Sequence, residues 1–473
     1  MTPTLAALVL YMLVQFGIGI WVSRRIVTED DYLVAGRRLG YPLATFSIFA
    51  TWFGAETTIG AAGAAYRDGV SLGSAEPFGY GLCLVLMGLV FAAPLWRRRL
   101  TTLADLFRDR YSPLVERVAA VILVPASILW AAAQIRAFGQ ILATTTTAID
   151  IDTAIAVAAG FTLLYTVFGG LLADAITDLV QGVLLVLGLV LLSAVVVHHV
   201  GGLEAFADAA LGSGRVRLAA SPGVPWLETL EAWAIPICGS VIATELVGRV
   251  IAARSPQVAR RSSLLAGAMY IAIGILPVAL GVVGVQILDG LGDAERILPT
   301  LARELLPTFG YALFAGALVS AILSTVDSTL LVSSGLLSHN LVVPIAGITS
   351  DRAKIRVARI GVLVFGLLAF VLARRAEGVY ALVEQASALG SAGTLVAVCF
   401  GLFTRFGGAP TALVTLVAGT AVYLVATASG ATAPFLVSLA AAFGTYVAGG
   451  ALELALRGQR AYGAGAAEAG DGG

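Results

Sequence analysis

The sequence predicts an all-α polytopic membrane protein with about thirteen transmembrane helices. Of its 473 residues, 59% are hydrophobic and only 12% are charged, and the mean hydropathy is +0.93. A soluble protein of this length needs more polar surface, so the composition excludes a soluble globular fold. Apolar windows recur along the whole chain, and basic residues gather in alternate connections between them. Both patterns are typical of a chain that crosses a membrane many times.

Windows of about twenty apolar residues define the segments that we expect to span the bilayer. They are 4–23, 42–65, 75–96, 117–147, 154–172, 177–200, 227–250, 261–288, 308–342, 357–374, 379–403, 409–428 and 433–456. Segments two to six and seven to eleven are expected to form two five-helix repeats of opposite topology, over roughly 42–200 and 227–403. We therefore expect one transmembrane domain over residues 1–456 and a disordered Gly/Ala-rich tail over 457–473.

The first segment and the distribution of basic residues together predict the orientation of the chain in the membrane. The segment lacks a basic start and an A-x-A cleavage site, so we expect it to be retained rather than removed as a signal peptide. With the N-terminus outside, roughly three quarters of the 29 Lys and Arg residues, Arg249 among them, fall in cytoplasmic connections. This bias predicts a multi-pass plasma-membrane protein with an external N-terminus and a cytoplasmic C-terminus.

The second segment overlaps the stretch FSIFATWFGAETTIGAAGAAYRDG at 46–69, which is too polar for a simple membrane anchor. It holds Glu56, Trp52, several hydroxyls and several glycines. A carboxyl group at mid-bilayer costs about 2.5–3.5 kcal/mol or more, so it usually has a function. Small residues also let a helix open where its backbone lines a cavity, as in transporter binding sites. Alternatively, they form a face for close helix packing.

The seventh segment has a similar character. Within WAIPICGSVIATELVGRV at 233–250, the apolar run is interrupted by Pro236, Gly239, Ser240, Thr244 and Glu245. This segment opens the second predicted repeat, as the second segment opens the first. We therefore expect a second broken helix here.

The ninth segment carries hydroxyl side chains on one helical face. In SAILSTVDSTLLVSS at 320–334, Ala321, Ser324, Thr325 and Ser328 recur at i, i+3, i+4 and i+7. Hydroxyls and released carbonyls can hold sodium, a hard cation, without trapping it. Alternatively, the hydroxyls bond back to their own helix. Asp327 in the same run favours a functional role, because an unpaired acid is costly there.

Enzymatic and signalling functions find little support. The three cysteines lie far apart in the sequence, and none of the three histidines lies near a partner that suggests a metal site, so we expect neither a disulfide framework nor a metal centre. An intramembrane enzyme built on Glu56 and Asp327 would lack a nucleophile–base constellation and a phosphate loop. A transporter-like sensor would need a signalling domain where this chain has a short tail. We therefore expect a transporter and not an enzyme, with no nucleic-acid partner.

Four motifs follow one another in a characteristic order and spacing. They are GAETTIGAAGAAY at 54–66, RRRLTTLADLFRDRYSP at 97–113, TVFGGLLADAITDLVQG at 166–182 and SAILSTVDSTLLVSS at 320–334. With them, the chain resembles the sodium:solute symporter family from about residue 32 to residue 405. Members of this family share the LeuT-like inverted-repeat fold, which the resemblance therefore implies here.

The resemblance also implies where the co-transported sodium ion binds. The ion would bridge the second and ninth segments, held by backbone carbonyls of Ala50, Phe53 and Ala321 and by the hydroxyls of Ser324 and Thr325. Asp178 matches a position that the family associates with the intracellular sodium route. A role as the N-cap of the sixth helix is compatible with that position.

Within the family, three further stretches are most similar to high-affinity choline transporters. They are ATWFG at 50–54, EPFGYGLCLVLMGLVFAAPL at 76–95 and LWAAAQIRAFGQ at 129–140. The similarity implies an aromatic cage for a quaternary ammonium, at Trp52, Tyr80 and Trp130. A cation over such a ring gains up to about 2 kcal/mol when it is desolvated. A further Trp is expected at a position that falls near Ala243, so the cage is incomplete.

Charged residues leave the solute class open. Glu56, Glu76 and Glu245 could pair with a cationic group of the solute. Of these, Glu56 and Glu245 are our predicted substrate contacts. Arg136 could bind a carboxylate of the solute, so zwitterions such as a betaine or an amino acid stay possible solutes. We expect a sodium-coupled secondary active symporter that imports a quaternary amine or amino-acid-like solute by alternating access. Monocarboxylates and sugars are the alternative solutes.

Overall fold

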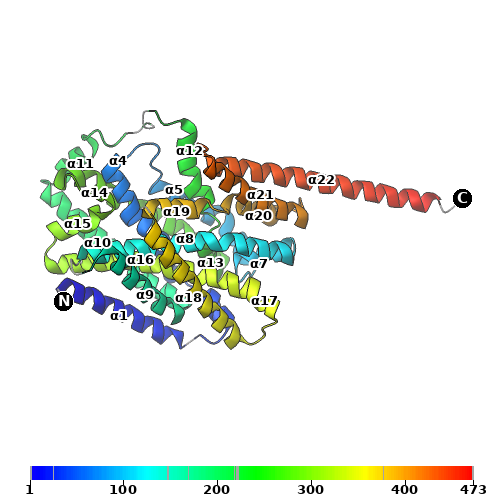
Figure 1. Cartoon of the computed structure of the whole chain (residues 1–473), viewed down its shortest axis with the longest axis horizontal. Helices are drawn as coiled ribbons and strands as arrows, with labels where there is room; N and C mark the ends of the chain where they lie inside the picture. Colours follow the sequence, from blue (N-terminus) through cyan, green and yellow to red (C-terminus); the bar gives the residue numbers. More distant parts are fainter. Residues whose placement is uncertain are drawn as a thin grey trace.

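The computed structural model describes residues 3–24, 26–145, 149–168, 170–217, 219, 223–376 and 378–470, and it describes no side chain beyond residue 456. Within these ranges the regular structure is helical, apart from two isolated β-bridges (Figure 1). The prediction of an all-α protein is therefore confirmed.

The predicted first repeat follows two short elements after the first segment. The order is α1 (Pro3–Ser23), α2 (Glu29–Val34), η1 (Ala35–Arg37), α3 (Tyr41–Trp52), η2 (Glu56–Ala61), α4 (Ala62–Asp68), α5 (Phe78–Leu86), η3 (Met87–Phe91), α6 (Ala92–Arg97), α7 (Leu103–Arg110), α8 (Pro113–Thr145), α9 (Ile151–Phe168) and α10 (Leu171–His199).

The second repeat and the two final helices complete the chain. The order is α11 (Leu203–Leu211), α12 (Trp226–Ala234), η4 (Ile235–Gly239), α13 (Thr244–Ala252), α14 (Pro256–Ile287), η5 (Ala294–Arg296), α15 (Ile297–Leu305), α16 (Thr308–Gly335), η6 (Leu336–Val342), α17 (Val343–Ala346), α18 (Asp351–Arg375), α19 (Val379–Ala388), α20 (Ser391–Phe403), α21 (Ala409–Ala428) and α22 (Pro434–Gly470).

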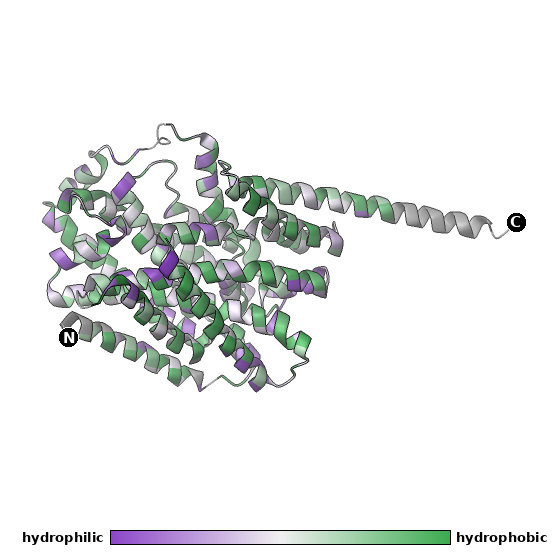
Figure 2. Cartoon of the chain, in the orientation of Figure 1, coloured by the Kyte–Doolittle hydropathy of each residue, from purple (hydrophilic) through white to green (hydrophobic). Residues whose placement is uncertain are grey.

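Ten helices in the described part of the chain are long and apolar enough to cross a membrane. Each of the predicted segments coincides with a helix or with a series of helical pieces. The described apolar parts of α1 and α9 are short, and the segment from α3 to α4 is interrupted. A multi-pass helical architecture is thus confirmed, and the count of thirteen stays a prediction. Hydrophobic residues line much of α1, α18 and α22, as expected for helices in contact with lipid (Figure 2).

Helix α22 continues to Gly470 and projects beyond the other helices (Figure 1). It thereby passes residue 456, the predicted end of the transmembrane domain. The side chains from residue 457 on, and residues 471–473 altogether, lie outside the described part. The disordered cytoplasmic tail at 457–473 therefore stays a prediction.

The two broken helices that open the repeats run in opposite directions. Leu39, just before α3, pairs with Ala253, just after α13. At the other end, Val70 follows α4 and pairs with Val216, which precedes α12. At both ends of the bundle, the start of one broken helix therefore lies beside the end of the other. This arrangement is the inverted topology that the sequence predicts.

A charged cluster joins four elements at the end of the bundle where α3 begins. The two ring nitrogens of His339 lie 3.0 Å from a Glu29 carboxylate oxygen and 3.3 Å from one of Asp105, and Lys354 lies 2.9 Å from Glu29. Burial alone would raise the pKa of Asp105, but hydrogen bonds from His339 and from the Thr102 backbone hold it below its ordinary value. The cluster therefore links α2, α7, η6 and α18 through ionised groups.

Candidate ion and solute site

Helix α3 ends at Trp52, and side chains accept the hydrogen bonds of the two N–H groups that follow its cap residue, Phe53. The backbone N–H of Gly54 donates to Glu56 Oε1 at 3.0 Å, and that of Ala55 donates to Gln134 Oε1 at 2.9 Å. Gln134 Nε2 in turn donates to Glu56 Oε2 at 3.1 Å. All of these residues are buried. Glu56 and Gln134 together therefore satisfy the two N–H groups that the break exposes, as a buried break requires.

This break releases backbone carbonyls toward α16. In a continuous helix, the N–H groups of residues 54 and 55 would bond the carbonyls of Ala50 and Thr51. Phe53 leaves the helical conformation, with φ −92° and ψ 61°. The Thr325 hydroxyl donates to Thr51 O at 2.9 Å and lies 3.2 Å from Ala321 O. The Thr325 hydroxyl therefore faces the released turn, and its assignment with Ala321 to the ion stays a prediction.

Asp178 joins the hydroxyl face of α16 to α3. It accepts hydrogen bonds from Ser47, at 2.5 Å, and from Ser324. The N-cap role suggested for Asp178 is wrong, because α10 begins at Leu171 and places Asp178 inside the helix. The Ser324 hydroxyl, one of the predicted sodium ligands, therefore contacts Asp178, the residue predicted for the sodium route.

Arg249 is fully buried, which corrects its placement among the cytoplasmic basic residues. Its Nη2 lies 2.5 Å from Asp174 and 3.5 Å from Asp178, and it also contacts Ser328. A buried guanidinium needs such paired acids because its desolvation is costly. The sequence signal that could have located it is the pair of acids one helical turn apart in the motif DAITD at 174–178.

Five aromatic rings form a continuous cluster beside the break. The ring centroids of Trp52 and Trp130 are 5.5 Å apart, those of Trp130 and Tyr80 6.1 Å, and those of Tyr80 and Tyr270 6.5 Å. Tyr270 also lies 5.1 Å from Phe53. The structure thus brings the three predicted cage residues together. Tyr270 was missed because it lies in an apolar run that resembles ordinary helix core.

Buried carboxyl groups surround this cluster. Glu76 contacts the Tyr270 hydroxyl at 3.3 Å and the Thr57 hydroxyl at 3.4 Å. Glu245 accepts a hydrogen bond from Ser127 of α8. Asp327 lies elsewhere, because its carboxylate accepts a hydrogen bond from Thr166 of α9 at 2.5 Å. Of the acids that the sequence singled out, Glu76 therefore contacts the aromatic cluster directly, whereas Asp327 contacts α9.

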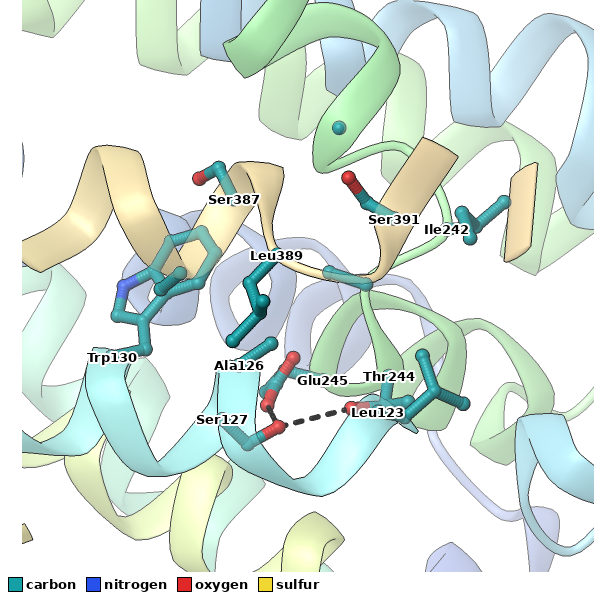
Figure 3. Close-up of a pocket in the computed structure, with 13 residues that line it drawn as sticks. Leu123, Ala126, Ser127, Trp130, Ile242, Thr244, Glu245, Ser387, Leu389 and Ser391 are labelled. Atoms are coloured by element: carbon teal, nitrogen blue, oxygen red, sulfur yellow. Dashed lines mark hydrogen bonds between the residues drawn. The ribbon is translucent and has the colours of Figure 1, made fainter. Parts of the chain in front are cut away.

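A pocket opens where α8 faces the interruptions of two other segments (Figure 3). It is lined by Leu123, Ala126, Ser127, Trp130, Gly239, Ile242, Ala243, Thr244, Glu245, Ala386, Ser387, Leu389 and Ser391. Of the predicted substrate contacts, Trp130 and Glu245 line this pocket. Trp52, Tyr80 and Glu56 are buried behind Trp130 or beside it and do not line the pocket. The predicted contacts therefore form a cluster and an adjoining pocket, rather than one closed cage.

Known proteins resemble this chain in sequence and in fold. A sequence model of the sodium:solute symporter family matches residues 32–419. The chain is 30% identical to the high affinity choline transporter 1 of Homo sapiens over 412 residues, which cover 80% of this chain and 68% of that protein. It is 28% identical to the sodium/pantothenate symporter of Escherichia coli over 71% of each chain. A solved Na+-coupled sialic acid symporter has a TM-score of 0.81 at 19% identity, covering 95% of this chain and 97% of that one, and so shares its fold.

Proposed function

The chain belongs to the sodium:solute symporter family, and from this premise we propose that it imports a quaternary amine or an amino-acid-like solute together with sodium. Family membership makes it a multi-pass membrane protein that couples the symport of a small solute to sodium. The proposal adds the solute class, the site residues and the direction. Import is favoured because each positive charge that moves inward gains about 2.3 kcal/mol per 100 mV of membrane potential.

One observation carries the choice of solute class. The aromatic cluster is surrounded by the buried carboxyl groups of Glu56, Glu76 and Glu245, whereas the buried guanidinium of Arg249 is bonded to Asp174. Aromatic faces and carboxylates both attract a desolvated cation. The similarity to a protein named for choline transport supports the same class. We assign Trp52, Tyr80, Trp130, Glu56 and Glu245 to the solute.

We assign sodium to the break in α3 and the hydroxyl face of α16. The proposed ligands are the carbonyls of Ala50, Phe53 and Ala321 and the hydroxyls of Ser324 and Thr325. The hydrogen bond from Thr325 to a carbonyl of the released turn supports this set. Asp178 would receive the ion on its way to the cytoplasm. We place the protein in the plasma membrane, with its N-terminus outside and its C-terminus in the cytoplasm.

Uptake by the purified protein in liposomes tests the proposal. With an inward sodium gradient, choline, glycine betaine, proline and a hexose are compared as labelled solutes. We expect an amine to accumulate and accumulation to stop when potassium replaces sodium. Accumulation of the hexose alone would contradict the solute class, and unchanged uptake in potassium would contradict sodium coupling.

Trp130→Ala is expected to weaken solute binding about tenfold or more. Trp130 is the aromatic residue shared by the cluster and the pocket, and a desolvated cation–π contact is worth up to about 2 kcal/mol. Trp130→Phe keeps an aromatic face and should retain most of the affinity. Half-saturating solute concentrations in the uptake assay measure the difference. Trp226→Ala removes a tryptophan that is 73% exposed and serves as the control; equal affinity in the Ala and Phe variants at position 130 would refute the ring contact.

Gly54→Ala is expected to raise the half-saturating sodium concentration about tenfold or more. A Cβ atom at this position would lie 2.6 Å from Thr325 Oγ1, 2.8 Å from Glu56 Oε2 and 2.9 Å from Gln134 Oε1. Relieving such overpacking costs about 1–3 kcal/mol and moves the hydroxyl that we assign to sodium. Gly316→Ala on α16 is the matched control, because its Cβ would meet nothing within 4 Å. Similar sodium dependence in both variants would argue against this geometry.

A further inference from the structure

The pocket in Figure 3 adjoins the aromatic cluster on one side. Trp130 belongs to both, and the Ser387 hydroxyl, which lines the pocket, lies 2.9 Å from the Tyr80 hydroxyl. A cation held against the face of Trp130 would therefore have the remainder of its molecule within reach of the pocket.

Small residues leave this side of the cluster open. Ala243 contributes only a methyl group to the wall. Gly239 lies directly against the Ser387 backbone carbonyl, and a Cβ there would also approach the Ser391 hydroxyl at 3.4 Å. The absence of a side chain at Gly239 thus lets the break before α13 approach the end of α19. The lining hydroxyls of Ser387 and Ser391 come from that region of the chain.

The polar side chains that line the pocket are four hydroxyls, the Trp130 indole and one carboxyl group. Among the described residues that line it, Glu245 is the one with a charged side chain. One of its carboxylate oxygens accepts from Ser127, and the other points away from Ser127 (Figure 3). Glu245 lies in the first turn of α13, where the helix dipole favours a negative charge. The pocket therefore offers a carboxylate oxygen to a donor group.

The neighbouring basic side chains are directed elsewhere. Arg249 lies one turn further along α13, and its guanidinium bonds Asp174 at 2.5 Å. Arg136 of α8 donates to the carbonyl of Ala373 on α18 at 3.2 Å and does not line the pocket. A carboxylate in this pocket would therefore meet Glu245 without a basic partner, and close like charges in a desolvated site repel strongly.

We propose that this pocket holds the end of the solute opposite its cationic head, and that this end must donate hydrogen bonds and carry no negative charge. The inference rests on the proposed function and narrows it. It selects amino alcohols and diamines, whose O–H or N–H groups donate to Glu245. It rejects betaines and amino acids, which place a carboxylate there.

Choline and glycine betaine provide a matched pair of probes, because both carry a trimethylammonium group. They differ in having a hydroxyl-bearing or a carboxylate-bearing end. Full-length protein in liposomes with a sodium gradient is used to compare their uptake, and each is also used to compete with the other. We expect at least a hundredfold preference for choline. Glu245→Gln removes the negative charge and supplies an amide donor, so this preference should fall at least tenfold, mainly through better use of betaine.

Two further variants separate the charge of Glu245 from its effect on folding. Glu245→Asp keeps the carboxylate and should keep the preference for choline. Glu384→Gln makes the same chemical change at an exposed position of α19 and should leave the preference unchanged. Sodium-dependent uptake that favours betaine in the unmodified protein would overturn the inference but leave the proposed function intact. An unchanged preference in a folded Glu245→Gln protein would also overturn it, whereas sodium-independent uptake of all amines would overturn the proposed function itself.

Discussion

Replacing Ser324 and Thr325 together with alanine is expected to abolish sodium-dependent uptake while the protein remains folded in the membrane. The double change removes both hydroxyls that we assign to the ion, and a hard cation with too few oxygen ligands does not give up its hydration shell. It also removes the hydrogen bond from Thr325 to Thr51 O and the one from Ser324 to Asp178. Uptake under a sodium gradient, with and without sodium, measures the loss.

The control for this experiment lies further along the same helix. Within the described part of the chain, the hydroxyls of Ser333 and Ser334 bond only to backbone carbonyls of α16, those of Thr329, Leu330 and Leu331. Their joint replacement by alanine removes the same number of hydroxyls from the same helix and should leave sodium dependence intact. If the Ser324 and Thr325 variant still responds to sodium as the unmodified protein does, the ion site lies elsewhere.

Arg249→Met is expected to lower the free energy of unfolding by about 3–5 kcal/mol, because it leaves buried acids without their cation. Arg249 and Asp178 are fully buried, and Asp174 is nearly so. Thermal and denaturant-induced unfolding of the purified protein in detergent measure the change. Arg67→Met is the matched control, since Arg67 and Asp68 form an ion pair at 2.8 Å with side chains 66% and 61% exposed. Exposed pairs contribute about 0–1 kcal/mol.

A second variant decides whether the missing charge is the cause. Combining Arg249→Met with Asp174→Asn and Asp178→Asn removes the unpaired negative charges and should restore much of the lost stability. If Arg249→Met is as stable as the Arg67→Met control, the buried ion pair does not stabilise the helices that it joins.

Polar residues in apolar segments predicted much of the architecture, including the break in α3. Glu56 and the glycines around it marked the break in α3, and the spacing of Ser324 and Thr325 marked one face of α16. These features are informative because lipid makes any unsatisfied polar group costly. The opposite directions of the two broken helices were predicted from their positions at the start of the two repeats.

Other parts of the site depend on contacts between distant segments. Arg249 lies near a predicted span end, where counting basic residues assigns it to a loop; its burial depends on Asp174, which comes from another helix. Tyr270 has no polar neighbour in sequence that distinguishes it from helix core. Glu56 was predicted as a solute contact, and the structure shows that it also closes the break through Gly54 and Gln134. That role requires an amide from α8, which no local pattern reveals.

Helix α8 touches both broken helices with one face, and this has a consequence for the length of the solute. Gln134 binds the break after α3, Ser127 binds Glu245 at the start of α13, and Trp130 lies between them at helical spacing. Seven residues of an α-helix rise about 10 Å, so the contacts of α8 with the two breaks are about 10 Å apart along the helix. A molecule that fits within this interval can touch both at once. We therefore expect the number of methylene groups between the two ends of the solute, more than its overall bulk, to limit what the protein carries.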